Sequence, residues 1–554
     1  MRTEHARRLA AAALTGAACL SVSSGAFASN PLEYPDNGSA SFSRGGAWLG
    51  VANEPIAAHY NPAALATQGS GFSIEQQLNF DHVCYDRRGP GNNPHVGPND
   101  QSLGPNGTPL LQYLPVCNSR GGFPSTIPSI SVAWRASDKL GFGLAVVPPA
   151  TYGTPRNAFP LETTGFNTRT NTTQLLPAPY RYMQTDNLST IIFPTASVGW
   201  EVIRHLRLGV GFISGIGVID VTQVGGTNNR SPTYEVGDHQ QDDGLARIVT
   251  KDLFVPGAVA SIHWSILPQL DISVWGRWMD AIRTHSADFT LTAQIFNQGS
   301  GAVQPTCTGL PSSCQTATVN VYKGATNALT LFEYKIPPEL RAGVRFHQPR
   351  TKSRLTWEQG REVRDPLHDD LFDVELDGSY DMNSKANTVV TRFKSLNGTG
   401  SVPVIPTGVE LPPNADRPTG FKDSFGLRVG GQWNAVRDKF AVRAGAWYES
   451  QSIDPAYMQV FPVGAERWGF GGGIVLRQDF IDISLGYQRH LSAGQNNNGD
   501  GKLLIPVGTG YSQPPFNTAN NIPGRTEFRS IHAINGGHIT ESANAFTLGG
   551  TVHF

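Results

Sequence analysis

Two arginines, Arg443 and Arg467, lie in stretches where apolar and polar residues alternate, and both fall on the polar face. A guanidinium group that points into a largely apolar space could bind a carboxylate through a bidentate contact. It could instead belong to a network of ion pairs, since buried charges are normally paired, and we favour this second interpretation. The acidic residues available for such a network are Glu449, Asp482 and Asp423.

An acidic stretch from Asp365 to Asp370, with Asp373 and Asp377 beyond it, could be offered as a calcium site. Calcium loops space their oxygen ligands regularly, and this stretch has no such spacing. We interpret it as a solvated segment of an external loop and predict no metal site. The chain also has no H-E-x-x-H or G-x-S-x-G motif and no phosphate loop, so we predict neither an enzyme nor a cofactor.

Four cysteines lie beyond the N-terminal leader, namely Cys84 and Cys117 in one loop-like stretch and Cys307 and Cys314 in another. Four cysteines allow three pairings, and the two local pairs are the simplest in an oxidising compartment. The alternative, free thiols or a metal site, lacks any C-x-x-C spacing. These four residues are therefore our candidates for disulfide bonds.

The elements that position these groups are indicated by strict alternation of apolar and polar residues, which is typical of strands with one dry and one wet face. The pattern is clearest from residue 423 onward. One face carries Phe425, Leu427, Val429, Gly431 and Trp433. Earlier hairpins are predicted at about residues 127–147, 190–219, 253–283 and 339–362.

Each predicted strand has about 9 to 11 residues, the length that a tilted strand needs to cross a bilayer. Short turns alternate with long polar connections, as in barrels with short periplasmic turns and long external loops. The long connections are predicted at residues 84–125, 220–252, 284–335 and 363–420. A β-sandwich or a secreted β-solenoid is the alternative, but the alternation continues to the final residue, Phe554, as in the insertion signal of outer-membrane barrels.

The composition agrees with a barrel without requiring one. The chain has 61 glycines and 39 prolines in 554 residues, and 16% of its residues are charged, so it is too rich in turn formers for an α-helical protein. Its formal net charge of -1 gives no global field that would attract nucleic acid. No nucleic-acid partner is therefore predicted.

The N-terminus has three arginines, an apolar run and the pattern Ala26-Phe27-Ala28, which predict a secretory signal peptide over residues 1–28. Cys19 raises a lipoprotein as an alternative, but Gly16 stands where an aliphatic residue is expected. Residues 29–70 show no sustained alternation and precede the first predicted strand. We predict that they fold into the barrel as a plug, because an open lumen would leak. The barrel is assigned residues 71–554.

Several short segments resemble, in their order and spacing, the FadL/TodX family of outer-membrane transporters for long-chain fatty acids and aromatic hydrocarbons. These segments run over the whole chain beyond the leader. They include Ser43-Arg44-Gly45-Gly46-Ala47, Asn61-Pro62-Ala63, Phe421-Lys422-Asp423, Val442-Arg443-Ala444-Gly445 and the terminal Phe554.

The resemblance implies an all-β fold, a transmembrane antiparallel β-barrel of 14 strands whose lumen is plugged by an N-terminal hatch. The hatch residues it implies are Arg44, Gly45, Asn61, Pro62 and Ala63, with the Asn61 side chain bonding to the backbone. Arg443 and Arg467 match family arginines and are the candidates for binding a ligand in the lumen. A sideways exit is implied beside the third strand, at Pro148, Pro149 and Gly153, although these prolines could simply end the strand.

The expected function is passive uptake of hydrophobic molecules, with long-chain fatty acids favoured over aromatic or aliphatic hydrocarbons. An outer-membrane lipid hydrolase and a non-specific porin are the less favoured alternatives. The expected partners of the chain, which we take to be a monomer, are the ligand, outer-membrane lipid with lipopolysaccharide, and the barrel-assembly machinery, which would recognise Phe554.

Overall fold

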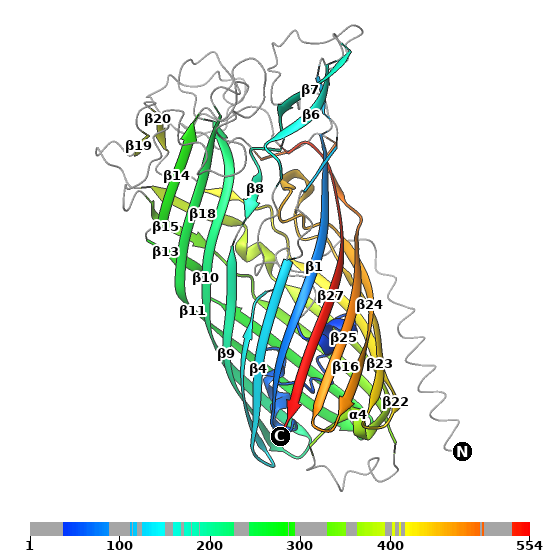
Figure 1. Cartoon of the computed structure of the whole chain (residues 1–554). Helices are drawn as coiled ribbons and strands as arrows, with labels where there is room; N and C mark the ends of the chain where they lie inside the picture. The colour runs from blue at the N-terminus through cyan, green and yellow to red at the C-terminus, as the bar shows by residue number, and fades with distance from the viewer. Residues whose placement is uncertain are drawn as a thin grey trace.

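The computed structural model shows a closed antiparallel β-barrel (Figure 1). It describes residues 37–87, 111–113, 115–118, 125–149, 159–167, 171–178, 180–187, 189–226, 243–285, 287–293, 329–350, 363–393, 402–404, 409–411, 416–498, 501–503 and 535–554. The predictions for residues 1–28, Gly153, Cys307 and Cys314 lie outside these ranges.

Fourteen strands form the ring, and each pairs with the next along the chain. They are β1 (Gly71–Arg87), β4 (Ser125–Ser137), β5 (Leu140–Val147), β9 (Thr190–Ile203), β10 (Leu206–Gly226), β11 (Asp243–Leu267), β12 (Leu270–Met279), β16 (Glu339–Pro349), β17 (Asp370–Asp381), β22 (Ser424–Val436), β23 (Phe440–Glu449), β24 (Arg467–Gln478), β25 (Ile481–Ser492) and β27 (Gly537–His553). The last strand returns to the first, from Gly71 opposite His553 to Arg87 opposite Gly537. This confirms the predicted fold class.

Short strands and helices add to the fourteen-stranded ring. The strands β3 (Val116–Cys117), β8 (Gln184–Asn187), β14 (Ala287–Ala293) and β26 (Gln495–Asn496) extend its sheet. Three small sheets comprise β13 (Ile282–Thr284), β15 (Leu329–Tyr334), β18 (Thr388–Phe393) and β21 (Arg417–Pro418); β2 (Leu111–Tyr113), β6 (Glu162–Asn167) and β7 (Thr172–Pro177); and β19 (Val402–Val404) with β20 (Val409–Leu411). The helices are α2 (Ser39–Ser43), α3 (Ala57–Tyr60), η1 (Pro62–Ala66), α4 (Pro366–Asp369), η8 (Asn383–Ala386) and η9 (Pro455–Tyr457).

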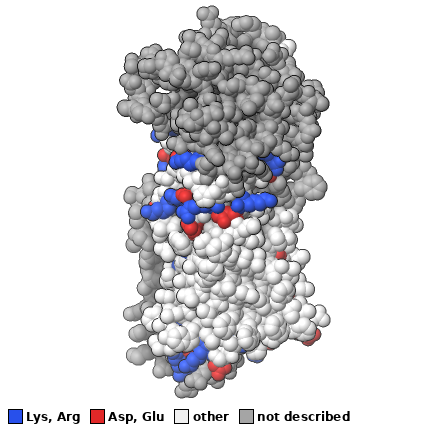
Figure 2. Space-filling model, turned by 90° about the vertical axis from the view of Figure 1, so that its left-hand side faces the viewer, with Lys and Arg blue, Asp and Glu red and all other residues white. Residues whose placement is uncertain are grey.

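The alternation in the sequence becomes two faces of the barrel wall. In β22, Leu427 and Val429 are exposed on the outside, whereas Arg428 and Gln432 are buried toward the lumen. Figure 2 shows a broad outer band that is almost free of charged side chains, with charges gathered above and below it. Such a band suits the hydrocarbon core of a bilayer. No helix of the described residues has the length and apolarity needed to cross a membrane.

The two ends of the barrel differ in their connections. Tight turns follow β4, β9, β11, β22 and β24, and they lie at the lower end in Figure 1, where the chain also ends. Most strand ends that are joined by long connections lie at the opposite end, which we call the loop end; the exception is residues 350–369 between β16 and β17, which join strand ends at the lower end, where α4 lies. This asymmetry confirms the predicted arrangement of short turns and long loops.

One predicted loop is wrong. Residues 363–420 were assigned to an external connection, but β17 occupies residues 370–381 and pairs with both β16 and β22. Its inward positions carry Asp373, Glu375 and Asp377, which are buried in the lumen. Acidic residues at alternate positions look like a solvated loop when the partners that neutralise them are far away in the sequence.

Residues 37–70, which we call the N-terminal segment, lie inside the lower half of the barrel (Figure 1). Most of this segment is buried, including its polar side chains. Apolar side chains of the segment pack against apolar side chains of the barrel wall, and together they form what we call the inner cluster. Members of this cluster are Trp48, Leu49, Ile56, Leu65, Phe193, Ile213, Val259, Trp275, Ile282 and Phe421.

A second group of apolar side chains, the outer cluster, lies toward the loop end. Its members include Tyr85, Phe159, Tyr180, Met183, Val224, Met458 and Val460. Tyr457 is partly buried and packs against both clusters. Two apolar clusters therefore lie inside the barrel, among many buried polar and charged side chains on the inward faces of its strands.

Leu376 tests the assignment of the outer surface. It lies in the middle of β17, opposite Val344 and Val429, and is 49% exposed. We expect Leu376→Arg to lower the free energy of unfolding by about 2–4 kcal/mol, because it would place a cation near the middle of the bilayer. Denaturant titration of the barrel in lipid vesicles measures this change.

The matched control is Asp138→Arg, which changes an exposed residue of the tight turn between β4 and β5. That variant should alter the free energy of unfolding by less than about 0.5 kcal/mol. Equal losses in the two variants would contradict a lipid-facing position for Leu376.

Candidate functional site

The N-terminal segment is bound by three acidic side chains of β17, namely Asp373, Glu375 and Asp377. The Arg44 guanidinium lies 2.6 Å from an oxygen of Asp373 and 3.3 Å from an oxygen of Glu375, and all three side chains are fully buried. Arg44 also donates a hydrogen bond of 2.8 Å to the backbone carbonyl of Ala47, three residues away. A single arginine thus fixes a turn of the segment and ties that turn to the barrel wall.

Backbone groups of the segment use the same acids. The N–H groups of Trp48 and Leu49 donate to one oxygen of Asp377, at 2.9 and 3.1 Å. The N–H groups of Gly50 and Val51 donate to Glu375. Charged acceptors make strong hydrogen bonds with backbone donors when water is excluded.

The predicted external location of the acidic stretch is therefore wrong. Asp373 and Asp377 lie in the lumen and bind the N-terminal segment, so water does not satisfy them. Asp365 lies at the turn end, where it accepts from the N–H of Leu367 and forms an ion pair with Arg477. Neither part resembles a calcium loop.

Asn61 fastens a second part of the segment. Its side-chain amide donates to the backbone carbonyl of Leu49 at 2.7 Å, across twelve residues. Pro62 begins the helix η1, and the N–H of Ala63 donates to the Ser261 hydroxyl of β11 at 2.8 Å. The Asn-Pro-Ala sequence thus links two turns of the segment to each other and to the wall.

Two wall glycines permit this close packing. A Cβ atom on Gly445 would lie 2.0 Å from the carbonyl oxygen of Arg44, and one on Gly209 would lie 2.0 Å from the nitrogen of Ala63. No side chain fits at such distances, so these positions require glycine. Gly45 has a positive φ of 64°, a conformation that other residues rarely adopt.

Arg467, one of the two predicted ligand-binding arginines, lies in the wall and is already paired. Its Nε donates to Glu449 at 2.6 Å, and Arg428 donates to the other oxygen of Glu449 at 2.8 Å. Glu449 was among the acids expected for such a network. All three side chains are buried.

Arg443 has a partner that the sequence did not suggest. Its guanidinium lies 3.7 Å from Glu54 of the N-terminal segment and donates to Gln432 at 2.7 Å. Glu54 lies in a part of the chain without periodicity, and almost 400 residues separate the two charges. For both arginines the geometry agrees with the network that we favoured.

The barrel wall has a break in pairing above β5. Residues 125–129 of β4 pair with β1 on one side, but β5 begins to pair only at Ile130. Residues 190–192 of β9 likewise pair with β10, whereas the pairing of β9 with β5 ends at Phe193. Pro148 and Pro149 follow the last residue of β5 and are buried. Within the described residues, no strand therefore lies between residues 125–129 of β4 and residues 190–192 of β9.

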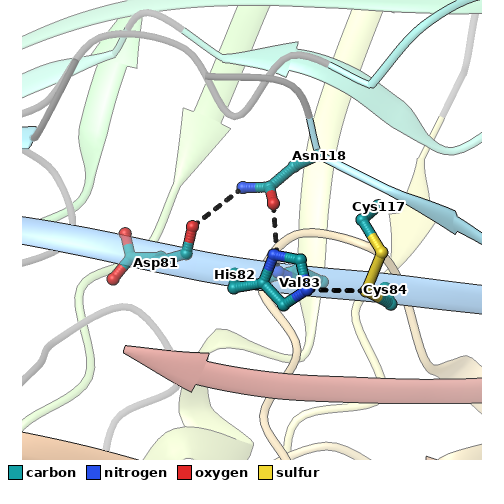
Figure 3. The surroundings of a disulfide bond; sticks show 6 residues. All are labelled: Asp81, His82, Val83, Cys84, Cys117 and Asn118. Atoms are coloured by element: carbon teal, nitrogen blue, oxygen red, sulfur yellow. Dashed lines mark hydrogen bonds between the residues drawn. A yellow bond between two sulfur atoms is a disulfide. The ribbon is translucent and has the colours of Figure 1, made fainter. Parts of the chain in front are cut away.

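The two cysteines among the described residues, Cys84 and Cys117, lie near the loop end. Cys84 of β1 and Cys117 of β3 stand directly opposite each other and form a disulfide (Figure 3). The His82 ring points toward it, with Nε2 3.2 Å from the sulfur of Cys84. The side chain of Asn118 adds hydrogen bonds to Val83 and Asp81 of β1. His82, Cys84 and Cys117 are close enough to hold a metal ion, but the disulfide uses both sulfur atoms.

Gly445→Ala tests how tightly the segment packs on the wall. The added methyl group would meet backbone atoms of Arg44, which cannot rotate away. We expect the free energy of unfolding to fall by about 1–3 kcal/mol. The amide groups of Trp48 and Leu49 should also exchange their hydrogens faster, because the turn that holds them would move.

The control is Gly550→Ala, in which the added Cβ meets no heavy atom within 4 Å. This variant should match the unaltered protein in both measurements. Unchanged exchange at Trp48 and Leu49 in Gly445→Ala would contradict the packing described above.

Comparison with known proteins adds evidence on the fold. No family model and no curated protein matches the sequence. Among solved structures, a FadL homologue of Pseudomonas aeruginosa aligns with 96% of this chain and 100% of its own, at 15% identity and a TM-score of 0.59. The toluene transporter TbuX of Ralstonia pickettii aligns with 95% of this chain and 99% of its own, at 12% identity and a TM-score of 0.51.

The toluene transporter TodX of Pseudomonas putida gives a similar result, with a TM-score of 0.51 at 12% identity over 94% of this chain and 99% of its own. At these identities the likeness establishes the fold, and it agrees with the 14-strand ring and its apolar band. The predicted resemblance and the predicted outer-membrane location are confirmed at this level. The chain has the fold of the FadL/TodX barrels of the Gram-negative outer membrane.

Proposed function

We propose that this chain is a passive outer-membrane channel for the uptake of hydrophobic small molecules, with long-chain fatty acids as its preferred ligands. The observation that carries the proposal is the pair of apolar clusters inside the barrel. The inner and outer clusters meet at Tyr457, so apolar side chains follow one another from the loop end toward the N-terminal segment. A hydrophobic ligand gains from such an interior, whereas a non-specific porin has a water-filled lumen.

The hydrophobic effect accounts for capture of the ligand. Burial of a C16 chain at ~0.8 kcal/mol per methylene would contribute on the order of 10 kcal/mol before the entropy cost of binding. Diffusion down a gradient and removal of the ligand inside the cell then complete a passive route.

The N-terminal segment acts in this proposal as the hatch, part of a predicted plug over residues 29–70 that follows a signal peptide of residues 1–28. Arg44, Gly45 and the Asn61 turn hold it against the wall through the contacts described above. Passage of a ligand requires either local movement of this segment or an exit above it.

The break in pairing above β5 supports an exit above the segment. The outward residues near it include Ile130, which is 46% exposed and faces the lipid. A ligand that leaves sideways would enter the membrane without exposing its chain to water. Pro148 and Pro149 cannot donate backbone hydrogen bonds, so they would keep this part of the wall unpaired.

Hydrocarbons are the alternative ligands, since two of the similar structures are named as toluene transporters. An enzyme is less favoured, because the same two structures are named as transporters. In keeping with the sequence, we propose a monomer inserted by the barrel-assembly machinery through Phe554, in contact with outer-membrane lipid and lipopolysaccharide.

Uptake of radiolabelled oleate by cells that lack their own fatty acid porter tests the function. Cells with the chain in the outer membrane should take up oleate in a saturable way, and cells without it should not. Uptake of toluene but not of oleate, from a correctly inserted barrel, would transfer the assignment to hydrocarbons. A barrel that transports neither ligand would contradict the proposed function.

Ser129→Trp tests the sideways exit. Ser129 is buried on the inner face of β4, in the stretch that lacks a β5 partner. A tryptophan there would fill the break, so oleate uptake should fall at least about tenfold while oleate binding to the purified barrel is retained. A bulky residue that does not enter the interior should have no such effect.

The control is Thr126→Trp, which places the same side chain on the outer face of β4. Oleate uptake by this variant should equal that of the unaltered barrel. Normal uptake by Ser129→Trp would indicate that the ligand leaves by another route.

A further inference from the structure

Arg417 occupies an unusual position in the interior near the loop end. It belongs to the short strand β21, where it stands opposite Val389 of β18. Its guanidinium donates hydrogen bonds to the side-chain oxygens of Gln223 on β10, at 2.5 Å, and of Gln459, at 2.9 Å. Three segments that are distant in the sequence thus converge on one cation.

Arg417 differs from three buried arginines described above in lacking an acidic partner among the described residues. Arg44, Arg443 and Arg467 each form an ion pair with a carboxylate. Both partners of Arg417 are neutral amides, and its sequence neighbour Asp416 is paired with Arg392 instead. Burial alone lowers the pKa of Arg417, to about 10, so the group keeps its charge at neutral pH.

Among the described residues, two side chains accept hydrogen bonds from this guanidinium. It carries five N–H groups, of which the two glutamines use two. A partly buried cation whose described partners are neutral favours an anion, which would add hydrogen bonds and balance its charge.

Several residues near Arg417 belong to the apolar clusters or pack against them. Gln459 lies between Met458 and Val460, which belong to the outer cluster. Val389, opposite Arg417, packs against the inner cluster, and so does Val221, close to Gln223 in β10. The cation therefore lies where the two apolar clusters meet.

We propose that Arg417 binds the carboxylate of a long-chain amphipathic ligand, whose chain packs along the apolar clusters. This assignment rests on the proposed uptake function and deepens it, because it selects fatty acids over hydrocarbons, which carry no charge. It also replaces Arg443 and Arg467 as the carboxylate site, since each of them already forms an ion pair with a carboxylate of this chain.

Binding of oleate and of oleyl alcohol to the purified full-length barrel in detergent tests the proposal. The two ligands share a chain and differ in the charge of the head group. Arg417→Gln should weaken oleate binding at least about tenfold, as expected for loss of a charge-assisted contact, and should leave oleyl alcohol binding unchanged. Arg417→Lys, which restores the charge without the planar fork, should recover part of the oleate affinity.

Arg392→Gln serves as the control, because it removes an arginine of the same small sheet that is paired with Asp416. It should leave the affinity for both ligands unchanged. Equal loss of both ligands in Arg417→Gln would assign Arg417 a structural role and overturn the proposal, as would unchanged oleate affinity in that variant.

The unaltered barrel separates this proposal from the one on which it rests. Saturable binding of oleyl alcohol without a preference for oleate would overturn the carboxylate site while retaining a hydrophobic channel. Absence of binding by either ligand would overturn both proposals.

Discussion

The hydrocarbon core of a membrane offers no hydrogen-bond partner to the backbone, and this constraint governs the rest of the structure. Strands can cross only if each finds a neighbour on both sides, so the fourteen strands close into a ring in which β27 returns to β1. Closure creates a lumen, which must then be filled. The break above β5 is a departure from this constraint, and two prolines, which have no N–H group to satisfy, stand beside it.

Charged contacts help to position the segment that fills the lumen. Acids of the wall accept hydrogen bonds from Arg44 and from backbone N–H groups of the N-terminal segment. Such contacts depend on exact placement, whereas apolar contacts tolerate sliding. The charged contacts therefore position the segment, and the apolar clusters leave a surface along which a ligand chain could move.

Strands in which apolar and polar residues alternate could be predicted from the sequence. Side chains whose binding partners are distant in the sequence could not be placed. The alternate spacing of Leu427 and Val429 is enough to predict the lipid-facing side of β22. β17 was taken for a loop, because its acids look solvated until Arg44 and the backbone of residues 48–51 are brought to them by folding. The pairing of Arg443 with Glu54 was missed for the same reason. The pairing of Cys84 with Cys117 could be predicted, because the two cysteines are close in the sequence and an oxidising compartment favours a disulfide.

The seam between β1 and β27 bears on how the molecule is assembled. It joins the first and the last strand of the ring over seventeen residue pairs, so the barrel can close only after nearly the whole chain has been delivered. Contacts so distant in sequence form slowly. Because the N-terminal segment directly precedes β1, it is tethered beside the seam, and closure of the seam encloses it together with its buried carboxylate contacts.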